Sequence, residues 1–384
     1  MCEQYDVIII GAGIQGAGVA QAAALCGYKT LVIEKNTDAG MGTSCKSSKL
    51  IHGGLRYLES AQFKLVKESL AERNRLLQNA PDLVKLIPFH IPVYQHSARP
   101  AWMICLGLLI YSLFSLKSFT RITKKDWSSL DGLNTQHLKQ VFKYFDAQTD
   151  DQQLTRRVIH SACELGAEIV YQAEFISSEY NTKHNVSYRS QQQQINVETE
   201  YLINCSGPWA QQTQKKIRPH LHLPELDLIA GTHLIINRHL KCGAYYLQAS
   251  DNRAVFVTPW KKSQTLIGTT ERSYTGDPDL IEPTAEEINY LIDTYNLNFD
   301  RKISHQDIHQ SFCGLRVLPA TNADIFNASR DSMMISNAEL PGLITLIGGK
   351  LTTYRASAEE VIRHIKTKKQ HHCKAKQTRN LSLD

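Results

Sequence analysis

The chain has 384 residues, of which 42% are hydrophobic and 21% charged. This length suits two domains rather than one, and the composition excludes a disordered protein. The net charge of +6 comes from positions 361–384, which hold seven basic residues and one acidic residue; the rest of the chain holds 36 of each sign and lacks the basic stripe of nucleic-acid-binding proteins.

The N-terminal segment predicts a βαβ unit. Tyr5–Ile10 is expected to form a buried strand, Ala17–Cys26 a helix that ends at Gly27, and Thr30–Glu34 the next parallel strand. No basic region or cleavage site precedes these elements, so we expect no signal peptide.

A glycine fingerprint, Gly11-Ala-Gly13-Ile-Gln-Gly16, joins the first strand to the helix. We expect Gly11 to form the tight turn, Gly13 to let the backbone approach a pyrophosphate, and Gly16 to let helix and strand pack closely. The helix N-terminus offers amide donors to the phosphates. Glu34 follows Gly16 by 18 residues, and its carboxylate is suited to ribose hydroxyls. These features predict a Rossmann-type dinucleotide site.

The stretch 101–116 holds 16 residues without a charge. A membrane-spanning helix needs roughly 18–20, so we interpret the stretch as a buried or interfacial helix. Further patterns predict helices at 62–79, 152–165 and 284–298, strands at 167–178, 195–204 and 228–270, and a polar loop or hairpin tip at Asn181–Gln194.

The C-terminal part predicts a last strand, Leu343–Ile347, then Gly348-Gly349-Lys350 and a helix from about Thr352 to Lys366. Residues 367–384 form a basic polar tail, which we interpret as a solvated segment, with contact to anionic lipid or nucleic acid as the alternative. The 9 cysteines are scattered and include no C-x-x-C pair. We therefore expect reduced thiols, a cytoplasmic setting and no metal site.

Two later motifs favour FAD over NAD. Asn204-Cys-Ser206-Gly207-Pro-Trp209 follows a strand, and Gly348-Gly349 lies between the last strand and a helix. A chain that reaches one dinucleotide from its beginning, middle and end is typical of FAD enzymes.

Long motifs in a fixed order resemble the FAD-dependent, respiratory (aerobic-type) glycerol-3-phosphate dehydrogenases. They are Thr43-Ser-Cys-Lys-Ser-Ser-Lys49-Leu-Ile-His52-Gly-Gly-Leu-Arg56-Tyr57-Leu-Glu59, Arg99-Pro-Ala-Trp102-Met, Ile267-Gly-Thr269-Thr270, Gly314-Leu-Arg316, Ser329-Arg330-Asp331 and Gly348-Gly-Lys350-Leu-Thr-Thr-Tyr-Arg355.

This resemblance implies oxidation of sn-glycerol 3-phosphate to dihydroxyacetone phosphate, with electrons passing through FAD to a membrane quinone. It implies a peripheral location on the inner face of the cytoplasmic membrane. The implied fold is α/β, a glycine-oxidase-like Rossmann-type FAD-binding domain with an antiparallel β-sheet substrate domain. We expect residues 1–85, 140–220 and 335–366 in the FAD-binding domain and residues 86–139 and 221–334 in the substrate-binding cap.

The resemblance also assigns the substrate residues. Arg316 and Arg330 are implied phosphate ligands, and planar guanidinium groups suit phosphate oxygens. Lys350 and Tyr57 are expected to join them. Thr269 matches a position near the substrate, although Thr270 beside it is an alternative.

Hydride transfer from the carbinol carbon needs a base for the hydroxyl proton. His52 is the candidate, because imidazole titrates near physiological pH, and Arg56 is expected to stabilise the developing oxyanion. Packing or positioning of the flavin is the alternative role for His52. The expected cofactor contacts are Gly11, Gly13, Gly16, Glu34, Thr43, Ser44, Ser48, Lys49, Ser206, Gly207, Gly348, Gly349, Leu351 and Thr352.

The chain departs from the family pattern in one large respect. It stops at Asp384, about where members of the family continue into a helical C-terminal domain that could serve dimerisation, stability or the quinone route. Cys45, Lys46 and Val317 also differ from the usual residues. Three interpretations stay open: the respiratory dehydrogenase, a related FAD-dependent oxidase of a hydroxy acid or amine that uses oxygen, and a non-catalytic FAD- or metabolite-binding remnant. A homodimer is a further open alternative.

Overall fold

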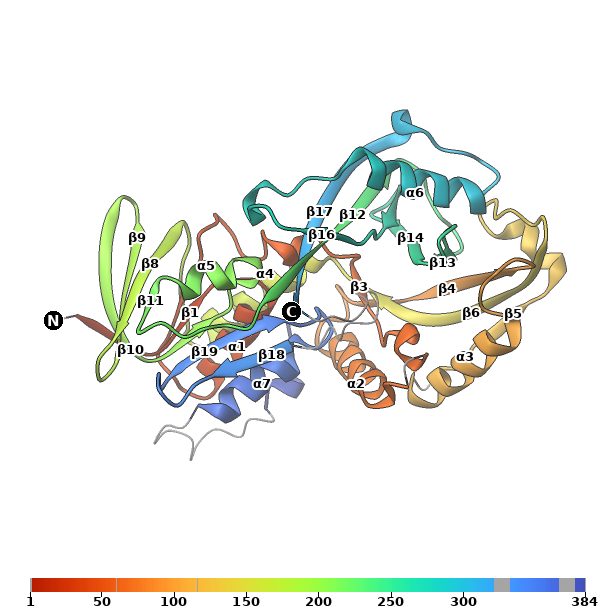
Figure 1. Ribbon diagram of the computed structural model, residues 1–384. Coiled ribbons are helices and arrows are strands. Elements are labelled where there is room, and N and C mark those ends of the chain that lie inside the picture. The colour runs from red at the N-terminus through yellow and green to blue at the C-terminus, as the bar shows by residue number, and fades with distance from the viewer. Residues whose placement is uncertain (1, 60, 116, 321–331, 366–376, 384) are drawn as a thin grey trace.

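The computed structural model describes residues 2–59, 61–115, 117–320, 332–365 and 377–383. These residues form two β-sheets that lie side by side in an elongated molecule (Figure 1). The helices are α1 (Ile14–Leu25), α2 (Phe63–Asn79), α3 (Ala101–Ser115), α4 (Asp151–Glu164), α5 (Ala210–Gln214), α6 (Ala285–Asn298) and α7 (Tyr354–His364). The short 3-10 helices are η1 (Thr43–Cys45), η2 (Leu55–Leu58), η3 (Lys124–Ser129), η4 (Gly207–Trp209), η5 (Pro278–Leu280), η6 (His305–Asp307) and η9 (Gln377–Asn380).

The first sheet has a parallel core in the order β19-β10-β1-β2-β7. An antiparallel meander of β8, β9 and β10 extends it on the side of β10. Its strands are β1 (Glu3–Ile10), β2 (Thr30–Ile33), β7 (Glu168–Val170), β8 (Ala173–Tyr180), β9 (His184–Ser190), β10 (Gln193–Asn204), β11 (Ile217–Arg218), β18 (Ser332–Ser336) and β19 (Leu343–Gly348).

Alternation along β1 gives this sheet its two cores. Val7 and Ile9 pack with the alanines of α1 and with apolar residues of α4 and α7, whereas Ile8 and Ile10 pack with residues of the meander. Small residues let α1 approach its neighbours closely. A Cβ on Gly18 of α1 would lie 2.7 Å from the ring of Tyr354, so a larger residue there would push α7 away.

The second sheet is antiparallel except where β13 pairs with β4. The helix α6 covers one face, with Leu291, Tyr295 and Phe299 in the same core as Val257 and Ile267 of the sheet. The strands are β3 (Leu50–Ile51), β4 (Lys85–Tyr94), β5 (Thr120–Ile122), β6 (Leu138–Gln148), β12 (Leu226–Ile236), β13 (Ala244–Gln248), β14 (Ala254–Trp260), β15 (Gln264–Gly268), β16 (Arg272–Tyr274) and β17 (Ile308–Pro319).

The two sheets confirm the predicted α/β class with a Rossmann-type half and a largely antiparallel half. The division into domains stays a proposal. β6 pairs with β4 along most of its length, so residues up to about 148 go with the second sheet, as does β3. β18, which begins at Ser332, goes with the first sheet. None of the helices in the described part of the chain is long and apolar enough to cross a bilayer.

The prediction of a loop or hairpin tip at 181–194 is confirmed in part: Gln191 and Gln192 form the turn between β9 and β10, but residues 184–190 form the strand β9. Its residues alternate between buried and exposed, with His184, Val186 and Tyr188 inside. That alternation is visible in the sequence, but the glutamines that follow it obscure it. The expectation of reduced thiols also fails at Cys26, which is disulfide-bonded, although 7 other cysteines are free.

The burial of His184 predicts a loss of stability in mild acid. Burial lowers the pKa of His184 to about 4, from an ordinary 6.5, while its Nε2 lies 3.2 Å from the carbonyl oxygen of Pro341. Between those pH values the unfolded chain binds a proton that the folded protein does not, so stability falls as the pH falls below 6.5.

We expect His184 to account for about 1.4 kcal/mol of stability lost between pH 7.5 and 5.5. Urea unfolding at both pH values measures the loss. A His184→Asn variant should be less stable at pH 7.5 and should show a smaller difference between the two conditions. An unchanged difference would contradict the prediction.

Candidate active site

A cavity of about 710 Å³ is lined by segments from the beginning, middle and end of the chain. This volume lies within the range of small-molecule and cofactor sites. The expected site residues that line it are Gly11, Gly13, Glu34, Thr43, Ser44, Ser48, His52, Tyr57, Ser206, Gly207, Thr269, Arg316, Gly348, Gly349, Lys350, Leu351 and Thr352.

The glycine turn brings the N-terminus of α1 to the wall of this cavity. Gly11 has a φ of +98°, and a Cβ on Gly16 would lie 1.9 Å from the carbonyl oxygen of Gly11, so the turn excludes larger residues at both positions. Gly13 is the N-cap of α1 and has no side chain of its own to cap the helix. The positive end of the helix therefore faces the cavity, as an anionic ligand requires.

Gln15 also lines the cavity, and the sequence interpretation missed it. Its amide nitrogen and oxygen are both buried without a hydrogen-bond partner in the described part of the chain. An unsatisfied buried amide costs roughly 1–3 kcal/mol, so this position fits a ligand that both donates and accepts. The variable position inside a glycine fingerprint gives little sequence signal for this role.

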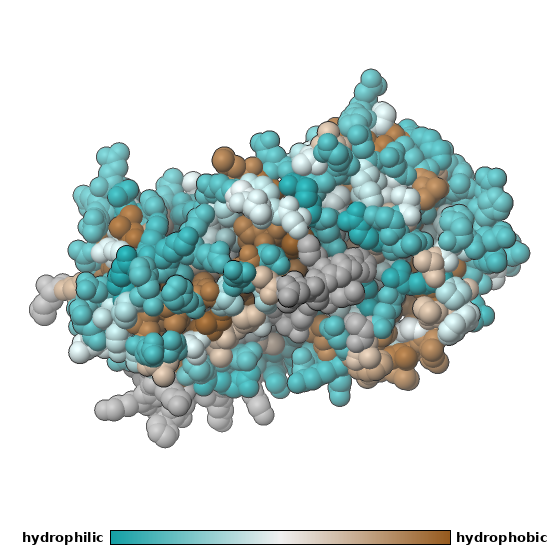
Figure 2. All heavy atoms as spheres, in the orientation of Figure 1, coloured by the Kyte–Doolittle hydropathy of each residue, from teal (hydrophilic) through white to brown (hydrophobic). Residues whose placement is uncertain are grey.

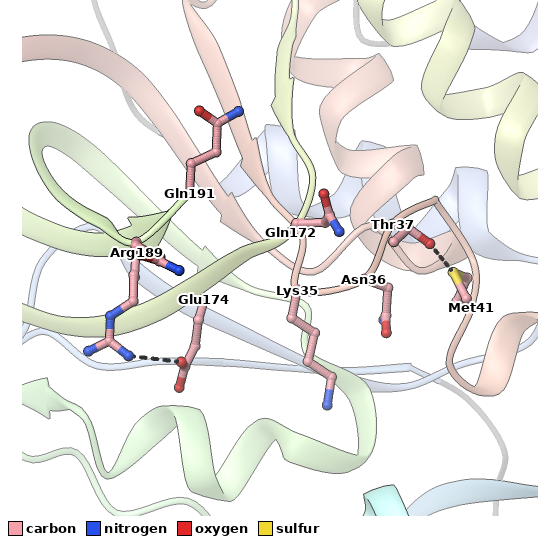
Figure 3. Close-up of a pocket in the computed structure, with 9 residues that line it drawn as sticks. Lys35, Asn36, Thr37, Met41, Gln172, Glu174, Arg189 and Gln191 are labelled. Carbon is pink, nitrogen blue, oxygen red and sulfur yellow. Dashed lines mark hydrogen bonds and ion pairs between the residues drawn. The ribbon is translucent and has the colours of Figure 1, made fainter.

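Glu34 lines the cavity at the end of β2 and braces the glycine turn. Its Oε2 accepts from the Ala12 amide at 2.6 Å, and its Oε1 accepts from the amide and the side chain of Asn36. A second pocket, of about 440 Å³, opens beside this end (Figure 3). Lys35, Asn36, Met41 and Glu174 line both spaces, and Arg189 pairs with Glu174 at 3.8 Å.

The segments from the middle and the end of the chain that line the cavity contain glycines in the left-handed backbone conformation. Gly207 has a φ of +58°, Gly348 of +67° and Gly349 of +92°, values that favour glycine. The Ser206 hydroxyl donates to the Asn204 side chain at 2.6 Å, which fixes the start of η4.

Segment 43–49 joins the two sheets beside the cavity. The Thr43 hydroxyl donates to the carbonyl of Leu315 at 2.8 Å, and the Ser44 hydroxyl accepts from the amide of Ile14 at 2.9 Å. Lys49 is not among the lining residues of the cavity, and its buried ammonium lies 2.6 Å from the carboxylate of Asp151. A direct contact between Lys49 and a ligand is therefore not supported by the geometry.

His233 is a second residue that sequence reasoning missed. It lines the cavity on the same face of β12 as Gly231 and stacks on Phe312 with ring centroids 5.0 Å apart. Its Nε2 lies 2.9 Å from the Ser48 hydroxyl. Burial, assisted by the nearby positive charges of Lys49 and Arg316, lowers its pKa to about 3, so the ring is neutral near pH 7. A histidine inside the apolar run of β12 was the available signal.

Cationic and aromatic groups also line the cavity. The Lys350 ammonium lies 4.2 Å from the centre of the Tyr57 ring. The Arg316 guanidinium donates to Glu271 at 3.0 Å and to the carbonyl of Thr270 at 2.9 Å, which fixes its plane. Such a pair of cations suits a phosphate dianion.

The structure separates the two candidate threonines. Thr269 lines the cavity. Thr270 is buried, and its hydroxyl accepts from the amide of Thr232 and donates to Glu287. Arg56, in η2, is half-buried and is not among the lining residues, and Arg330 lies outside the described residues. Within the described residues, no group of three or more side chains is arranged to hold a metal ion.

Comparisons with known proteins agree with this geometry. The family model described as FAD dependent oxidoreductase matches residues 6–355. The aerobic glycerol-3-phosphate dehydrogenase of Escherichia coli (strain K12) is 36% identical over 94% of this chain and 73% of its own length. The D-erythritol 1-phosphate dehydrogenase of Brucella abortus (strain 2308) is 33% identical over 95% of this chain and 74% of its own.

A solved structure, the glycerol-3-phosphate dehydrogenase from Bacillus halodurans complexed with FAD, superposes with a TM-score of 0.76 at 26% identity. The match covers 94% of this chain but 64% of the Bacillus chain, so this chain spans less than two thirds of that protein.

Proposed function

The chain belongs to the FAD-dependent oxidoreductases and, among them, to the FAD-dependent glycerol-3-phosphate dehydrogenases, and from this premise we propose that it oxidises sn-glycerol 3-phosphate to dihydroxyacetone phosphate. FAD is the cofactor of this family. The observation that carries the proposal is one cavity lined both by a helix N-terminus and Glu34, which suit a nucleotide, and by Arg316 and Lys350, which suit a phosphate.

The cavity residues that suit a nucleotide also fit FAD. The N-terminus of α1, the backbone at Gly13 and the unsatisfied amide of Gln15 would hold the pyrophosphate side, and Glu34 the ribose. When bound, FAD supplies the acceptor for a hydride.

Elsewhere in the cavity wall, Arg316, Lys350 and Tyr57 bind and orient the substrate phosphate. His52, which also lines the cavity, removes the proton of the carbinol hydroxyl, so that the carbinol carbon can release its hydride and become the ketone. Arg56 adjoins Tyr57 in η2 but does not line the cavity, so its proposed role, to stabilise the developing negative charge on oxygen, rests on the resemblance of the sequence motif alone.

Anaerobic reduction of the bound flavin tests this function. The purified yellow protein should bleach rapidly when glycerol 3-phosphate is added. A flavin that stays oxidised would support the non-catalytic alternative. A protein that cannot be reconstituted with FAD would contradict the proposal, because the proposed reaction requires bound FAD. Peroxide formation in air would favour oxygen over a quinone as the acceptor.

A second substrate deserves a place in the same assay. The similarity to the D-erythritol 1-phosphate dehydrogenase favours a longer polyol phosphate as the alternative, because the phosphate and the secondary hydroxyl are shared. Faster bleaching by D-erythritol 1-phosphate would reassign the substrate but leave the roles of Arg316 and Lys350 intact.

We further propose that α3 places the protein on the inner face of the cytoplasmic membrane, next to the quinone. Its outer face is apolar: Trp102 is 66% exposed and Leu113 is 71% exposed. Figure 2 shows hydrophobic atoms gathered at the lower right, where α3 lies in Figure 1. The other exposed apolar residues of this face are Met103, Leu106 and Leu109.

The charge around α3 supports a lipid surface. The helix contains no acidic or basic residue. Exposed basic side chains follow it at Lys117, Arg121, Lys124 and Lys125, and each basic residue near an anionic membrane contributes about 1 kcal/mol of attraction. An apolar helix face with basic neighbours is typical of interfacial binding.

The pair of substitutions Leu109→Glu and Leu113→Glu should lower binding to vesicles of mixed neutral and anionic lipid at least about tenfold, because each removes an apolar contact and adds a charge of the wrong sign. Co-sedimentation measures the binding. Leu280→Glu is the matched control, since Leu280 is 74% exposed but lies outside α3. Equal losses in both variants would contradict a specific role for α3.

A further inference from the structure

The loop after β3 carries three residues of the proposed site, His52, Arg56 and Tyr57. Its backbone is closely packed: a Cβ on Gly53 would lie 2.5 Å from Leu70 and 2.6 Å from the Tyr111 hydroxyl. Gly54 has a φ of +74° and leads directly into η2. The position of this short loop therefore determines where the candidate base and the substrate tyrosine stand in the cavity.

A buried polar chain from three elements holds this loop. The Tyr111 hydroxyl of α3 accepts from the amide of Gly53 at 2.9 Å and donates to Asp146 Oδ2 of β6 at 2.6 Å. Asp146 Oδ1 accepts from the Arg73 guanidinium of α2 at 2.8 Å. Tyr111, Asp146 and Arg73 are each at most 2% exposed.

Burial fixes the direction of these hydrogen bonds. Loss of hydration raises the pKa of Tyr111 well above its ordinary value, so the hydroxyl keeps its proton and donates it to the carboxylate. Its oxygen is then left to accept from Gly53. Because polar groups in such an interior are costly unless their bonds are complete, the Asp146–Arg73 pair orients the hydroxyl and the hydroxyl orients the loop.

We propose that Tyr111 is a positioning residue that holds His52 and Tyr57 in place through the amide of Gly53. This inference rests on the proposed function, because only that function gives His52 and Tyr57 a role in catalysis. The hydrogen bonds that hold the loop do not depend on it. Packing alone does not require the hydroxyl, since a phenylalanine would fill the same apolar cluster of Leu65, Val66, Leu70 and Phe142.

The test compares Tyr111→Phe with Tyr144→Phe in the full-length, FAD-loaded protein. Tyr144 is buried in the same cluster and packs edge-to-face on Tyr111 with ring centroids 5.8 Å apart. Its substitution removes one hydroxyl from the same core and leaves the Tyr111–Gly53 bond in place. Both variants are scored for FAD dissociation constant, melting temperature, flavin reduction and hydrogen exchange of the amides at 52–58.

We expect Tyr111→Phe to raise exchange at 52–58 about tenfold and to slow flavin reduction at saturating glycerol 3-phosphate about tenfold, while the FAD dissociation constant stays within about twofold. Tyr144→Phe should change neither readout. A lower melting temperature in Tyr111→Phe with normal exchange at 52–58 and a normal reduction rate per bound FAD would overturn the proposal. If the unmodified protein is not reduced by glycerol 3-phosphate, the proposed function fails, and exchange at 52–58 alone still supports or overturns the positioning role.

Discussion

Replacement of Arg316 by alanine is expected to lower kcat/KM for glycerol 3-phosphate about a hundredfold to a thousandfold. The guanidinium lines the cavity, and its plane is fixed by Glu271 and by the carbonyl of Thr270. Truncating one partner of a buried charged pair costs about 2–5 kcal/mol, and each 1.36 kcal/mol is a factor of ten in rate. The loss should appear mainly in KM if Arg316 binds the phosphate equally in the ground state and the transition state.

Two comparisons separate phosphate binding from a general defect. Arg316→Lys keeps the charge but loses the planar fork, so it should recover part of the loss. Reduction by unphosphorylated glycerol should be nearly the same in the alanine variant and the parent, because glycerol lacks the group that Arg316 binds. An equal loss with both substrates, at full FAD content, would contradict the assignment.

Local signals in the sequence were sufficient to predict the first βαβ unit. The glycine fingerprint, the alanine-rich helix and the two apolar strands each have a short-range physical cause, and the structure has them as β1, α1 and β2. The strand β9 shows the limit of this approach: its alternation was present, but the polar residues after it favoured a turn.

The site residues that sequence reasoning missed depend on tertiary structure. His233 enters the cavity because of the register of β12 against β15 and β17, which no local pattern states. Gln15 becomes significant only when Gly349 is seen to approach it, since a Cβ there would lie 2.2 Å from its amide nitrogen. Lys49 lies in a segment predicted to bind the cofactor. Its ammonium instead forms an ion pair with Asp151, about a hundred residues later in the chain.

Both His52 and His233 line the cavity, and the low basicity of His233 argues against it as the base. Burial and the positive charges near His233 hold its pKa at about 3, so its imidazolium would give up a proton far too readily to serve as a base for an alcohol. Its contact with the Ser48 hydroxyl instead suits a neutral group that shapes the wall of the cavity. We therefore keep the proposal that His52, half-buried beside Phe256, is the base.

His52→Asn should therefore lower the rate constant of anaerobic flavin reduction at saturating glycerol 3-phosphate by about a hundredfold to ten-thousandfold, the usual contribution of a general base. Asparagine keeps a polar side chain of similar length but cannot take the proton. His233→Asn, measured beside it at equal FAD content, should lose less than about tenfold. The reverse order would transfer the base role to His233 and would mean that substrate binding restores its basicity. A small loss in both variants would mean that another group accepts the proton of the substrate hydroxyl. The proposed binding of the phosphate would still be tested separately by the Arg316 variants.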